Sequence, residues 1–521
     1  MAATFRRFAV NSTIAVAAAA AAGMFTGSAS AELSQPWTWC VNKEKASPDL
    51  QISGCTTVIQ SGKETKKNLS IAFNNRGNGH RAKGDNENAL ADYNQSIRLD
   101  PNYSYPHNGR GNVYHDKKDY DHALADYDKA IRLDPKYASP YNGRGNVYQD
   151  KKDYDRAIPE YDQAIRLDPN YALAYNGRGN AYNAKKDYDR AIADYNQSIR
   201  LDAKYSSPHN GRGNAYRSKG DLDRALPDYD EAIRLDPRSA LPLNGRGNVY
   251  FDKKDYDRAI VDYSEAIRVD PKYAIAFNNR GLAYGRKKDP DRAIADYNQA
   301  IALDPQYAVA YDNRGDAYSA KGDYDRAIAD YSEALRIDPK YTIAYNDRGY
   351  AYSRKKDYDR AIADYNEALR IDPSHTAALS NRASAYENKN QYAQAIEGYD
   401  QLIRLQPTNA NWWNYRCWDR AIVGELQAAL TDCNESLRLR ADDANTIDSR
   451  ALVYLKLGDL DKSLADYDAA LKLNPKLAGS LYGRGVVKQK KGDSAGAEAD
   501  MAAAKAMRSN VAEQWANYGV K

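Results

Sequence analysis

Hydrophobic and polar positions repeat along this chain with a period of 34 residues. A representative copy occupies residues 139–169, and related copies run from about residue 68 to about residue 509. When the proline that ends each copy is numbered 32, apolar or small side chains fall at positions 4, 8, 11, 20, 24 and 27. The first three of these share one face of a helix and the last three share one face of another, because residues three and four apart are neighbours on a helix. Each copy therefore predicts two amphipathic helices.

The period holds through 13 copies without an insertion. Position 8 is mostly glycine, position 20 is alanine in every copy except Ser463, and position 24 is tyrosine from Tyr93 to Tyr399. A glycine facing an alanine lets two antiparallel helices approach closely, and the tyrosine rings can fill the space beside that contact. We therefore expect each copy to be a closely packed helix pair.

Polar residues mark the ends of the second helix. An aspartate at position 16, such as Asp153, follows a KK or KG turn and can cap the free amides of that helix. The proline at position 32, such as Pro169, ends the helix because it lacks an amide hydrogen and disfavours helix in the residue before it. One helix pair cannot bury its own apolar face, so successive copies are expected to stack.

The pattern resembles the tetratricopeptide repeat. That family has a large residue at position 4, Gly or Ala at 8, Tyr at 11, Ala at 20, an aromatic residue at 24 and Pro at 32. The resemblance covers roughly 85% of the chain. It implies an all-α fold, a right-handed α-solenoid of about 13 helix pairs over residues 68–509 with capping segments at both ends.

The amino-terminal residues 1–31 have the features of a secretory signal peptide. Arg6 and Arg7 form a basic start, residues 14–22 are apolar, and residues 29–31 form a small-residue cleavage site. The alternative, an uncleaved membrane anchor, is disfavoured because the apolar run is short and rich in alanine. We therefore predict a periplasmic or secreted protein whose mature chain does not span a membrane.

Two further segments flank the repeats. Residues 32–67 include an approximately helical apolar face, which predicts an amino-terminal capping segment with a half-repeat. Residues 510–521 place Trp515 and Tyr518 on one helical face, which predicts a carboxy-terminal capping helix. Atypical repeats are expected at the ends of a solenoid.

Four cysteines in an exported chain predict disulfides, with three possible pairings. Cys417 and Cys433 fall at positions 8 and 24 of the eleventh copy, where Gly and Tyr normally face each other. This placement favours Cys417 with Cys433 and leaves Cys40 with Cys55. The alternative is four free thiols that act as small apolar residues. A zinc site is disfavoured because there is no C-x-x-C and no histidine beside the cysteines.

The eleventh copy also carries three tryptophans, Trp412, Trp413 and Trp418. Two interpretations compete. The rings and a disulfide replace the lost packing of Gly and Tyr, or exposed tryptophans anchor a partner. We favour packing.

The sequence contains no arrangement typical of catalysis or metal binding. The nearest pair of histidines, His115 and His122, is seven residues apart without a further ligand, and no nucleophile, base and orienting group come together. We therefore predict a protein that is not an enzyme and that needs no metal or cofactor.

Asparagine stands at positions 5 and 9 in the first six copies. The pairs are Asn74 and Asn78, Asn108 and Asn112, Asn142 and Asn146, Asn176 and Asn180, Asn210 and Asn214, and Asn244 and Asn248. The resemblance implies that positions 2, 5, 9 and 12 line a concave groove, so these residues are candidate partner-binding residues. An amide is both donor and acceptor, which suits the backbone of an extended peptide or the hydroxyls of a sugar. The alternative is that the amides were inherited by duplication and are only solvated. From the seventh copy onward, position 9 changes to Leu282, Asp316, Tyr350, Ser384 and Trp418.

Arginine occupies position 7 in all 13 copies, from Arg76 to Arg484, and position 23 is acidic in all but Gly398. We interpret this as an ion pair between the two helices of one repeat. The alternative is an arginine row that binds anionic ligands.

The sequence thus favours a scaffold that binds protein partners in its groove in the bacterial cell envelope. The alternative is an accessory factor for polysaccharide or cell-wall binding and export. Nucleic acid is excluded as a partner, because export and a formal charge of +4, which falls to +2 without Arg6 and Arg7, do not suit a polyanion.

Overall fold

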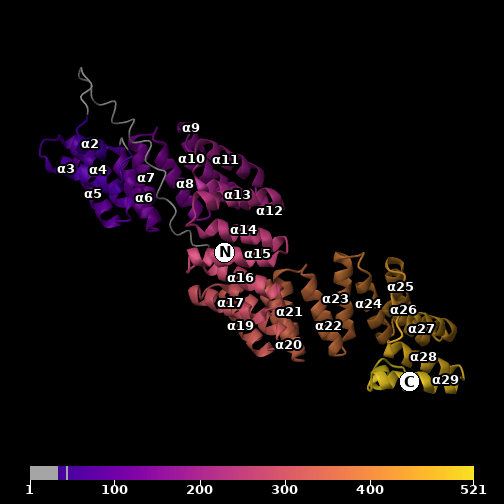
Figure 1. The fold of residues 1–521 in the computed structure, drawn as a ribbon. Coiled ribbons are helices and arrows are strands. Elements are labelled where there is room, and N and C mark those ends of the chain that lie inside the picture. Colours follow the sequence, from indigo (N-terminus) through magenta and orange to yellow (C-terminus); the bar gives the residue numbers. More distant parts are fainter. Residues whose placement is uncertain (1–32, 43–44, 521) are drawn as a thin grey trace. The chain divides into compact units, whose positions relative to one another are not determined.

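A computed structural model describes residues 33–42 and 45–520 of the chain. The predicted signal peptide, residues 1–31, lies outside these described residues. The described part contains helices and turns but no strand. Its residues fall into two compact units, one within residues 33–271 and the other within residues 272–520. In Figure 1 the helices of each unit follow one another in chain order as stacked pairs.

The helices of the first unit begin with α2 and α3 and continue as six repeated pairs. They are α2 (Gln35–Cys40), α3 (Pro48–Gln60), α4 (Lys66–Ala82), α5 (Asn86–Leu99), α6 (Ser104–Asp116), α7 (Tyr120–Leu133), α8 (Ala138–Asp150), α9 (Tyr154–Leu167), α10 (Ala172–Ala184), α11 (Tyr188–Leu201), α12 (Ser206–Ser218), α13 (Leu222–Leu235), α14 (Ala240–Asp252) and α15 (Tyr256–Val269).

The second unit contains seven repeated pairs and a short final helix. They are α16 (Ala274–Arg286), α17 (Pro290–Leu303), α18 (Ala308–Ala320), α19 (Tyr324–Ile337), α20 (Thr342–Arg354), α21 (Tyr358–Ile371), α22 (Thr376–Asn388), α23 (Tyr392–Leu405), α24 (Ala410–Val423), α25 (Leu426–Leu439), α26 (Ala444–Leu457), α27 (Leu460–Leu473), α28 (Ala478–Lys490), α29 (Ser494–Met507) and α30 (Val511–Asn517).

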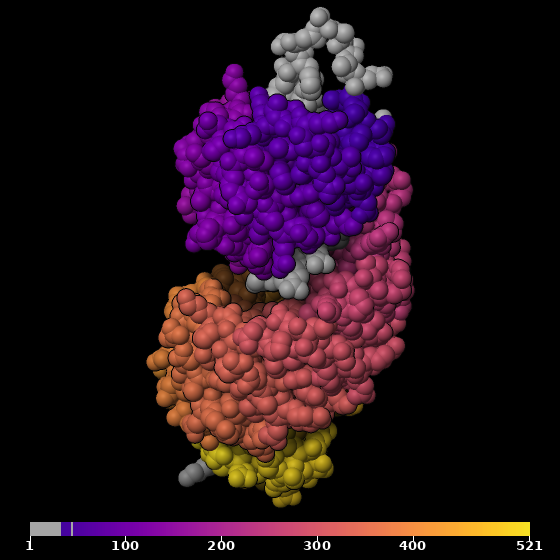
Figure 2. Space-filling model, turned by 90° about the vertical axis from the view of Figure 1, so that its left-hand side faces the viewer, coloured from indigo at the N-terminus to yellow at the C-terminus, as the bar shows by residue number. Residues whose placement is uncertain are grey.

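Each 34-residue period is one helix pair, and each pair packs on the next, so the expected all-α solenoid is confirmed. Among the described helices of a unit, the first helices of neighbouring repeats contact each other, as α8 contacts α10, except α22 and α24, whereas the second helices of neighbouring repeats do not. The first helices therefore lie on the inside of the curve. We call the side chains at positions 2, 5, 9 and 12 of the first helices the inner face. On the face visible in Figure 2, successive repeats of a unit form a continuous packed surface.

The tyrosine at position 24 lies at the centre of the core in every repeat except the eleventh and thirteenth, which have Cys433 and Met501 there. Tyr127 is 1% exposed, and its ring lies between Gly111 of its own repeat and Gly143 of the next. A Cβ atom built at Gly143 would come within 2.6 Å of the ring carbons of Tyr127. Position 6 is therefore glycine in these repeats because the ring of the preceding repeat fills the space of a side chain.

The turn between the two helices forms as the sequence predicts. The carboxylate of Asp153 accepts a hydrogen bond from the backbone N–H of Arg156 at 3.1 Å and caps α9. The residue before the aspartate has a left-handed backbone, and it is glycine in some repeats, such as Gly84 with φ 78°, and lysine in others, such as Lys118 with φ 61°. A lysine there carries a small conformational cost that glycine avoids.

The structure joins Cys40 to Cys55 and Cys417 to Cys433, the pairing that the sequence favours. The first disulfide connects α2 to α3 ahead of the repeats. The second connects the two helices of the eleventh repeat. No helix in the described part of the chain is both long and apolar enough to cross a membrane.

Candidate functional site

The asparagines at position 9 lie on the inner face with their amide oxygens already engaged. In each of the first six repeats the position 24 tyrosine donates its hydroxyl hydrogen to this oxygen at 2.7 to 2.8 Å. The pairs are Tyr93 with Asn78, Tyr127 with Asn112, Tyr161 with Asn146, Tyr195 with Asn180, Tyr229 with Asn214 and Tyr263 with Asn248.

The Nδ2 amino groups of these side chains differ from the amide oxygens in their hydrogen bonding. Within the described part of the chain, the Nδ2 atoms of Asn78, Asn112, Asn146, Asn180 and Asn214 donate no hydrogen bond. Asn78 is exposed and the other four are half-buried. This row therefore offers hydrogen-bond donors, whereas the sequence alone suggested both donors and acceptors.

The asparagines at position 5 are more deeply placed. Asn74, Asn108, Asn142, Asn176 and Asn244 are 2 to 8% exposed, and Asn210 is half-buried. Asn108 and Asn176 each donate to the tyrosine that ends the repeat, to Tyr137 and Tyr205, both at 3.1 Å. Position 5 therefore forms the deepest part of the inner face in these repeats.

The arginines at position 7 form the predicted ion pairs. Arg110 donates from Nε and Nη2 to the two carboxylate oxygens of Asp126 at 2.8 and 2.7 Å, and from Nη1 to Asn94 of the preceding repeat at 2.6 Å. Burial acts to raise the pKa of Asp126, but hydrogen bonds from Arg110 and His107 hold it below its ordinary value. Each such arginine thus ties its own two helices together and also contacts the preceding repeat.

Equivalent position 7 to position 23 pairs occur in 12 repeats. The exception is Arg382, where position 23 is Gly398. Arg382 donates to Asn366 at 2.8 Å, and burial lowers its pKa. Because the other guanidinium groups are engaged within the repeats, the geometry supports the structural role over an anion-binding row.

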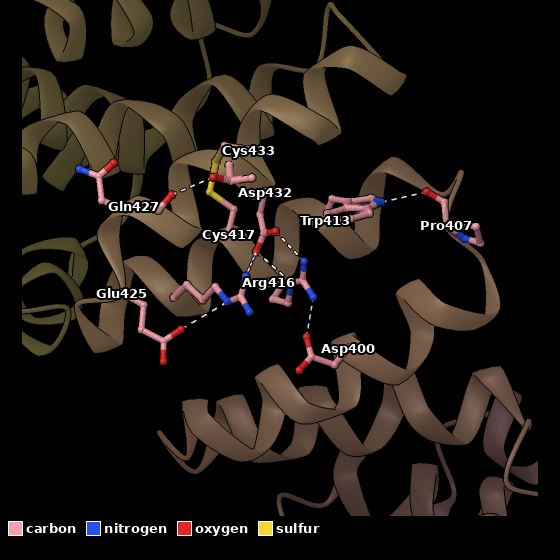
Figure 3. A network of polar contacts seen from close by, with 11 residues as sticks. Asp400, Pro407, Trp413, Arg416, Cys417, Glu425, Gln427, Asp432 and Cys433 are labelled. Atoms are coloured by element: carbon pink, nitrogen blue, oxygen red, sulfur yellow. Dashed lines mark hydrogen bonds and ion pairs between the residues drawn. A yellow bond between two sulfur atoms is a disulfide. The ribbon is translucent and has the colours of Figure 1, made fainter.

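The eleventh repeat replaces the usual packing with a polar and disulfide network (Figure 3). Arg416 bridges Asp432 and Asp400 at 2.6 and 2.5 Å, next to the Cys417–Cys433 disulfide. The Nε1 atom of Trp413 donates to the carbonyl oxygen of Pro407 at 2.9 Å.

The other two tryptophans of that repeat are also in contact. Trp412 donates to the side chain of Gln406 at 3.0 Å, and the Trp418 ring meets that of Tyr518 with ring centres 5.3 Å apart. All three tryptophans thus have packing partners, as the favoured interpretation expects.

The Trp418 ring also contacts the carboxy-terminal end of the chain. We call residues 511–520 the carboxy-terminal segment. Its Trp515 is 2% exposed and packs on Tyr482, at position 5 of the last repeat, with ring centres 5.6 Å apart. Its Tyr518 reaches Trp418, at position 9 two repeats earlier. The segment therefore caps the last repeat and continues along the inner face of the eleventh to thirteenth repeats.

A second departure is a buried acid, Asp419, beside the half-buried Glu387. Asp419 is 0% exposed, and in the described part of the chain neither of its carboxylate oxygens has a hydrogen-bond partner. Burial, together with the nearby charge of Glu387, raises its pKa to about 9. Tyr399 donates to Glu387 at 2.6 Å, and burial raises the pKa of Glu387. Most other repeats have Ala or Val where Asp419 stands.

Sequence reasoning missed an acidic cluster on the inner face of the second unit. Asp312, Asp316 and Asp347 bring one carboxylate oxygen each within 4.8 Å of the others. Asp316 and Asp347 line a cavity of about 710 Å³ together with tyrosines and Arg354. Burial and the neighbouring acids raise the pKa of Asp312 to about 8 and that of Asp347 to about 7. The available signal was that these positions are predominantly Asn or Gly in the earlier repeats.

Models of known protein families match much of the chain. Models described as TPR repeat match residues 77–118, 111–152, 213–254, 247–288 and 451–492. Models described as tetratricopeptide repeat match residues 142–206, 313–376, 274–307, 352–416 and 296–329. No curated protein matches the chain significantly.

Solved structures with similar folds include three that differ in length. The MamA structure is 31% identical and covers 31% of this chain and 94% of its own, with a TM-score of 0.29. YrrB, titled a TPR protein with an unusual peptide-binding site, is 26% identical and covers 35% of this chain and 95% of its own, with a TM-score of 0.29. The APC/C hetero-tetramer Cut9-Hcn1 is 16% identical and covers 85% of this chain and 94% of that chain, with a TM-score of 0.42. Because the family models together match more than half of the sequence, the chain belongs to the tetratricopeptide repeat family.

Proposed function

We propose that this protein is a non-enzymatic scaffold that binds segments of partner proteins on its inner face, in the periplasm or outside the cell. The observation that carries the proposal is the carboxy-terminal segment. It places Trp515 and Tyr518 against aromatic side chains at positions 5 and 9, where a partner segment would lie in the other repeats.

The first unit offers a different binding surface from the one under this segment. Its row of Nδ2 donors recurs once per repeat from Asn78 to Asn214. Backbone carbonyl oxygens of an extended chain are acceptors that recur regularly, so they complement such a row without requiring a particular sequence. Binding would then rest on many weak contacts to a preformed surface.

The proposed location rests on the two disulfides and on the predicted signal peptide. Disulfides form and persist in oxidising compartments such as the periplasm and are rare in the cytosol. Both disulfides are in the described part of the structure and account for all four cysteines.

A photo-crosslinking amino acid at Asn146 tests for a partner in the protein's own compartment. We expect capture of one or two proteins, and loss of capture when the probe is moved to Lys152 in the turn. Capture of glycan alone, or equal capture at both positions, would contradict a protein-binding inner face.

A second experiment tests whether binding needs the Nδ2 donors, with substitutions that should leave the fold intact. Asn112, Asn146 and Asn180 changed together to Asp lose Nδ2 but keep an oxygen for the tyrosine hydroxyl. Asp316 already accepts from Tyr331 in this way at 2.8 Å, so the repeats should still fold. We expect the captured partner to bind at least about tenfold more weakly, the equivalent of about 1.4 kcal/mol. Asn170→Asp, an exposed change of the same charge in a turn, is the control.

A further inference from the structure

Two junctions between repeats in the second unit contain an amide hydrogen bond that the acidic cluster lacks. Asn313 donates from Nδ2 to the side-chain oxygen of Asn278 at 2.8 Å, which joins position 6 of one repeat to position 5 of the repeat before it. The equivalent bond between Asn381 and Asn346 is 3.0 Å long. Each bond pairs one donor with one acceptor.

Between these two junctions, the same positions hold Asp312 and Asp347. When both are ionised, these carboxylates can only accept hydrogen bonds, so in that state the pair cannot form the bond that both neighbouring junctions make. Asp312 is 4% exposed, and its Oδ1 atom has no hydrogen-bond partner in the described part of the chain. A buried acceptor without a partner is costly, which indicates that something positive belongs between the two carboxylates.

The third carboxylate completes the donor set. Asp316 stands one helical turn after Asp312, and one oxygen from each of the three acids lies within 4.8 Å of the others. Hydrogen bonds from Tyr341, Tyr331 and Asn346 hold one oxygen of each acid in place, of Asp312 at 3.0 Å, of Asp316 at 2.8 Å and of Asp347 at 3.0 Å. These bonds orient the acids without neutralising them.

No ion pair among the described residues joins these three acids to a basic side chain. Burial raises the pKa of Asp316, and the hydrogen bond from Tyr331 and the nearby charge of Arg286 offset this only in part. Arg354 lines the adjacent cavity but donates to the hydroxyl of Tyr350 at 3.0 Å. Once ionised, the three acids therefore present negative charge on the inner face with no ion-paired basic side chain to neutralise it.

We propose that Asp312, Asp316 and Asp347 bind one hard divalent cation of the size of Ca²⁺. Carboxylate oxygens are the preferred ligands of such ions, and Ca²⁺ lies about 2.3 to 2.6 Å from each oxygen. Oxygens on opposite sides of one ion are therefore up to about 5 Å apart, which accommodates this cluster. The adjacent cavity of about 710 Å³ gives access from solvent and room for waters that complete the coordination. The cation would join the eighth repeat to the ninth in place of the missing amide bond.

The test is titration calorimetry with CaCl₂ on the full mature chain, after removal of metals with a chelator. We expect one Ca²⁺ per chain and a higher midpoint of thermal unfolding with Ca²⁺ than with chelator. Asp347→Asn should weaken binding at least about tenfold. Asp325→Asn removes the same charge from an exposed position of the eighth repeat and should bind Ca²⁺ normally.

A variant with both Asp312→Asn and Asp347→Asn distinguishes loss of Ca²⁺ binding from loss of folding. It recreates the amide pair of the neighbouring junctions, so the variant should fold without Ca²⁺ and gain no stability when Ca²⁺ is added. The proposal is overturned if neither Ca²⁺ nor Mg²⁺ binds the native chain, or if this variant binds as tightly as the native chain. Binding of a lysine-rich or arginine-rich peptide that Asp347→Asn abolishes, without any effect of cations, would assign the cluster to a basic partner instead.

Discussion

The first six repeats and the later seven use the same framework to present different inner faces. Both groups keep the alanine or serine at position 20 and an arginine at position 7. Both also use the position 16 cap, except in the tenth and eleventh repeats, where Gln391 and Glu425 do not cap the second helix. In the first group positions 5 and 9 of the inner face are Asn in every copy, whereas positions 2 and 12 vary. In the second group position 9 carries apolar, acidic, aromatic and small polar residues. The residues that hold a repeat together are thus separate from those that it presents.

The two groups also differ at position 6. In the second to sixth repeats this position is glycine, and the tyrosine ring of the preceding repeat packs against it. In the seventh to tenth repeats it is Asn or Asp, and Asn313 and Asn381 donate hydrogen bonds across their junctions. The second unit therefore has polar groups between repeats that can be changed to carry charge, and the acidic cluster occurs at one such junction.

The largest effect on local stability is expected from the loss of a position 7 arginine. Arg178→Ala would leave the buried Asp194 without its ion pair, and we expect a loss of about 3 to 5 kcal/mol in local stability. Arg382→Ala should cost only about 1 kcal/mol, because this arginine donates to the neutral Asn366 and has no ion pair among the described residues. Native-state hydrogen exchange of α10 and α11 against α22 and α23 measures both, since a long repeat array need not unfold in one step. Equal losses at the two sites would show that the ion pair contributes nothing.

The disulfide of the eleventh repeat gives the next largest effect. Changing Cys417 and Cys433 together to Ala removes a link across 16 residues, and we expect repeat 11 to lose about 2 to 4 kcal/mol. Exchange protection of α24 and α25 should fall, whereas protection of α8 and α9 in the first unit should stay unchanged. A uniform loss across both units would contradict the view that repeats are stabilised locally.

Asp419 should make the stability of the eleventh repeat depend on pH. The repeats that contain α6 and α8 lack this acid, because they have Val113 and Val147 at the same position. Its pKa of about 9 in the folded protein exceeds the ordinary 3.8, so the folded state holds its proton more tightly. The stability that protonation provides is therefore lost as pH rises from about 4 to about 9.

The substitution Asp419→Val tests this directly. At pH 8 we expect a gain of about 1 to 3 kcal/mol in the stability of the eleventh repeat, because a buried acid without a partner is removed. The gain should shrink as pH falls toward 5. Denaturation experiments at several pH values, with unfolding monitored by hydrogen exchange, would show this. A gain that is independent of pH would mean that Asp419 is ionised in the folded protein.

The smallest effect concerns the turn. Lys118→Gly should stabilise its repeat by at most about 1 kcal/mol, because glycine adopts a φ of 61° without steric cost but is more flexible when unfolded. The reverse change, Gly322→Lys in the second unit, should destabilise its repeat by a similar amount. Thermal unfolding of the two variants checks the prediction, and the same sign in both would refute it.

The sequence by itself determined the repeat unit and its internal bonds. The 34-residue period placed both helices of each pair, the position 16 cap, the position 7 to position 23 ion pair and the pairing of Cys417 with Cys433. All of these contacts join residues within about half a repeat, so helical geometry and spacing suffice to predict them.

What only the tertiary structure decided lies between repeats and on their surface. Stacking placed Asp347 against Asp312, 35 residues earlier, and brought Tyr518 to Trp418. It also buried the position 5 asparagines and directed the position 24 hydroxyl to the position 9 amide, which leaves donors where the sequence suggested donors and acceptors. These features depend on how far one helix pair rotates against the next, and side-chain spacing within one repeat does not specify that rotation.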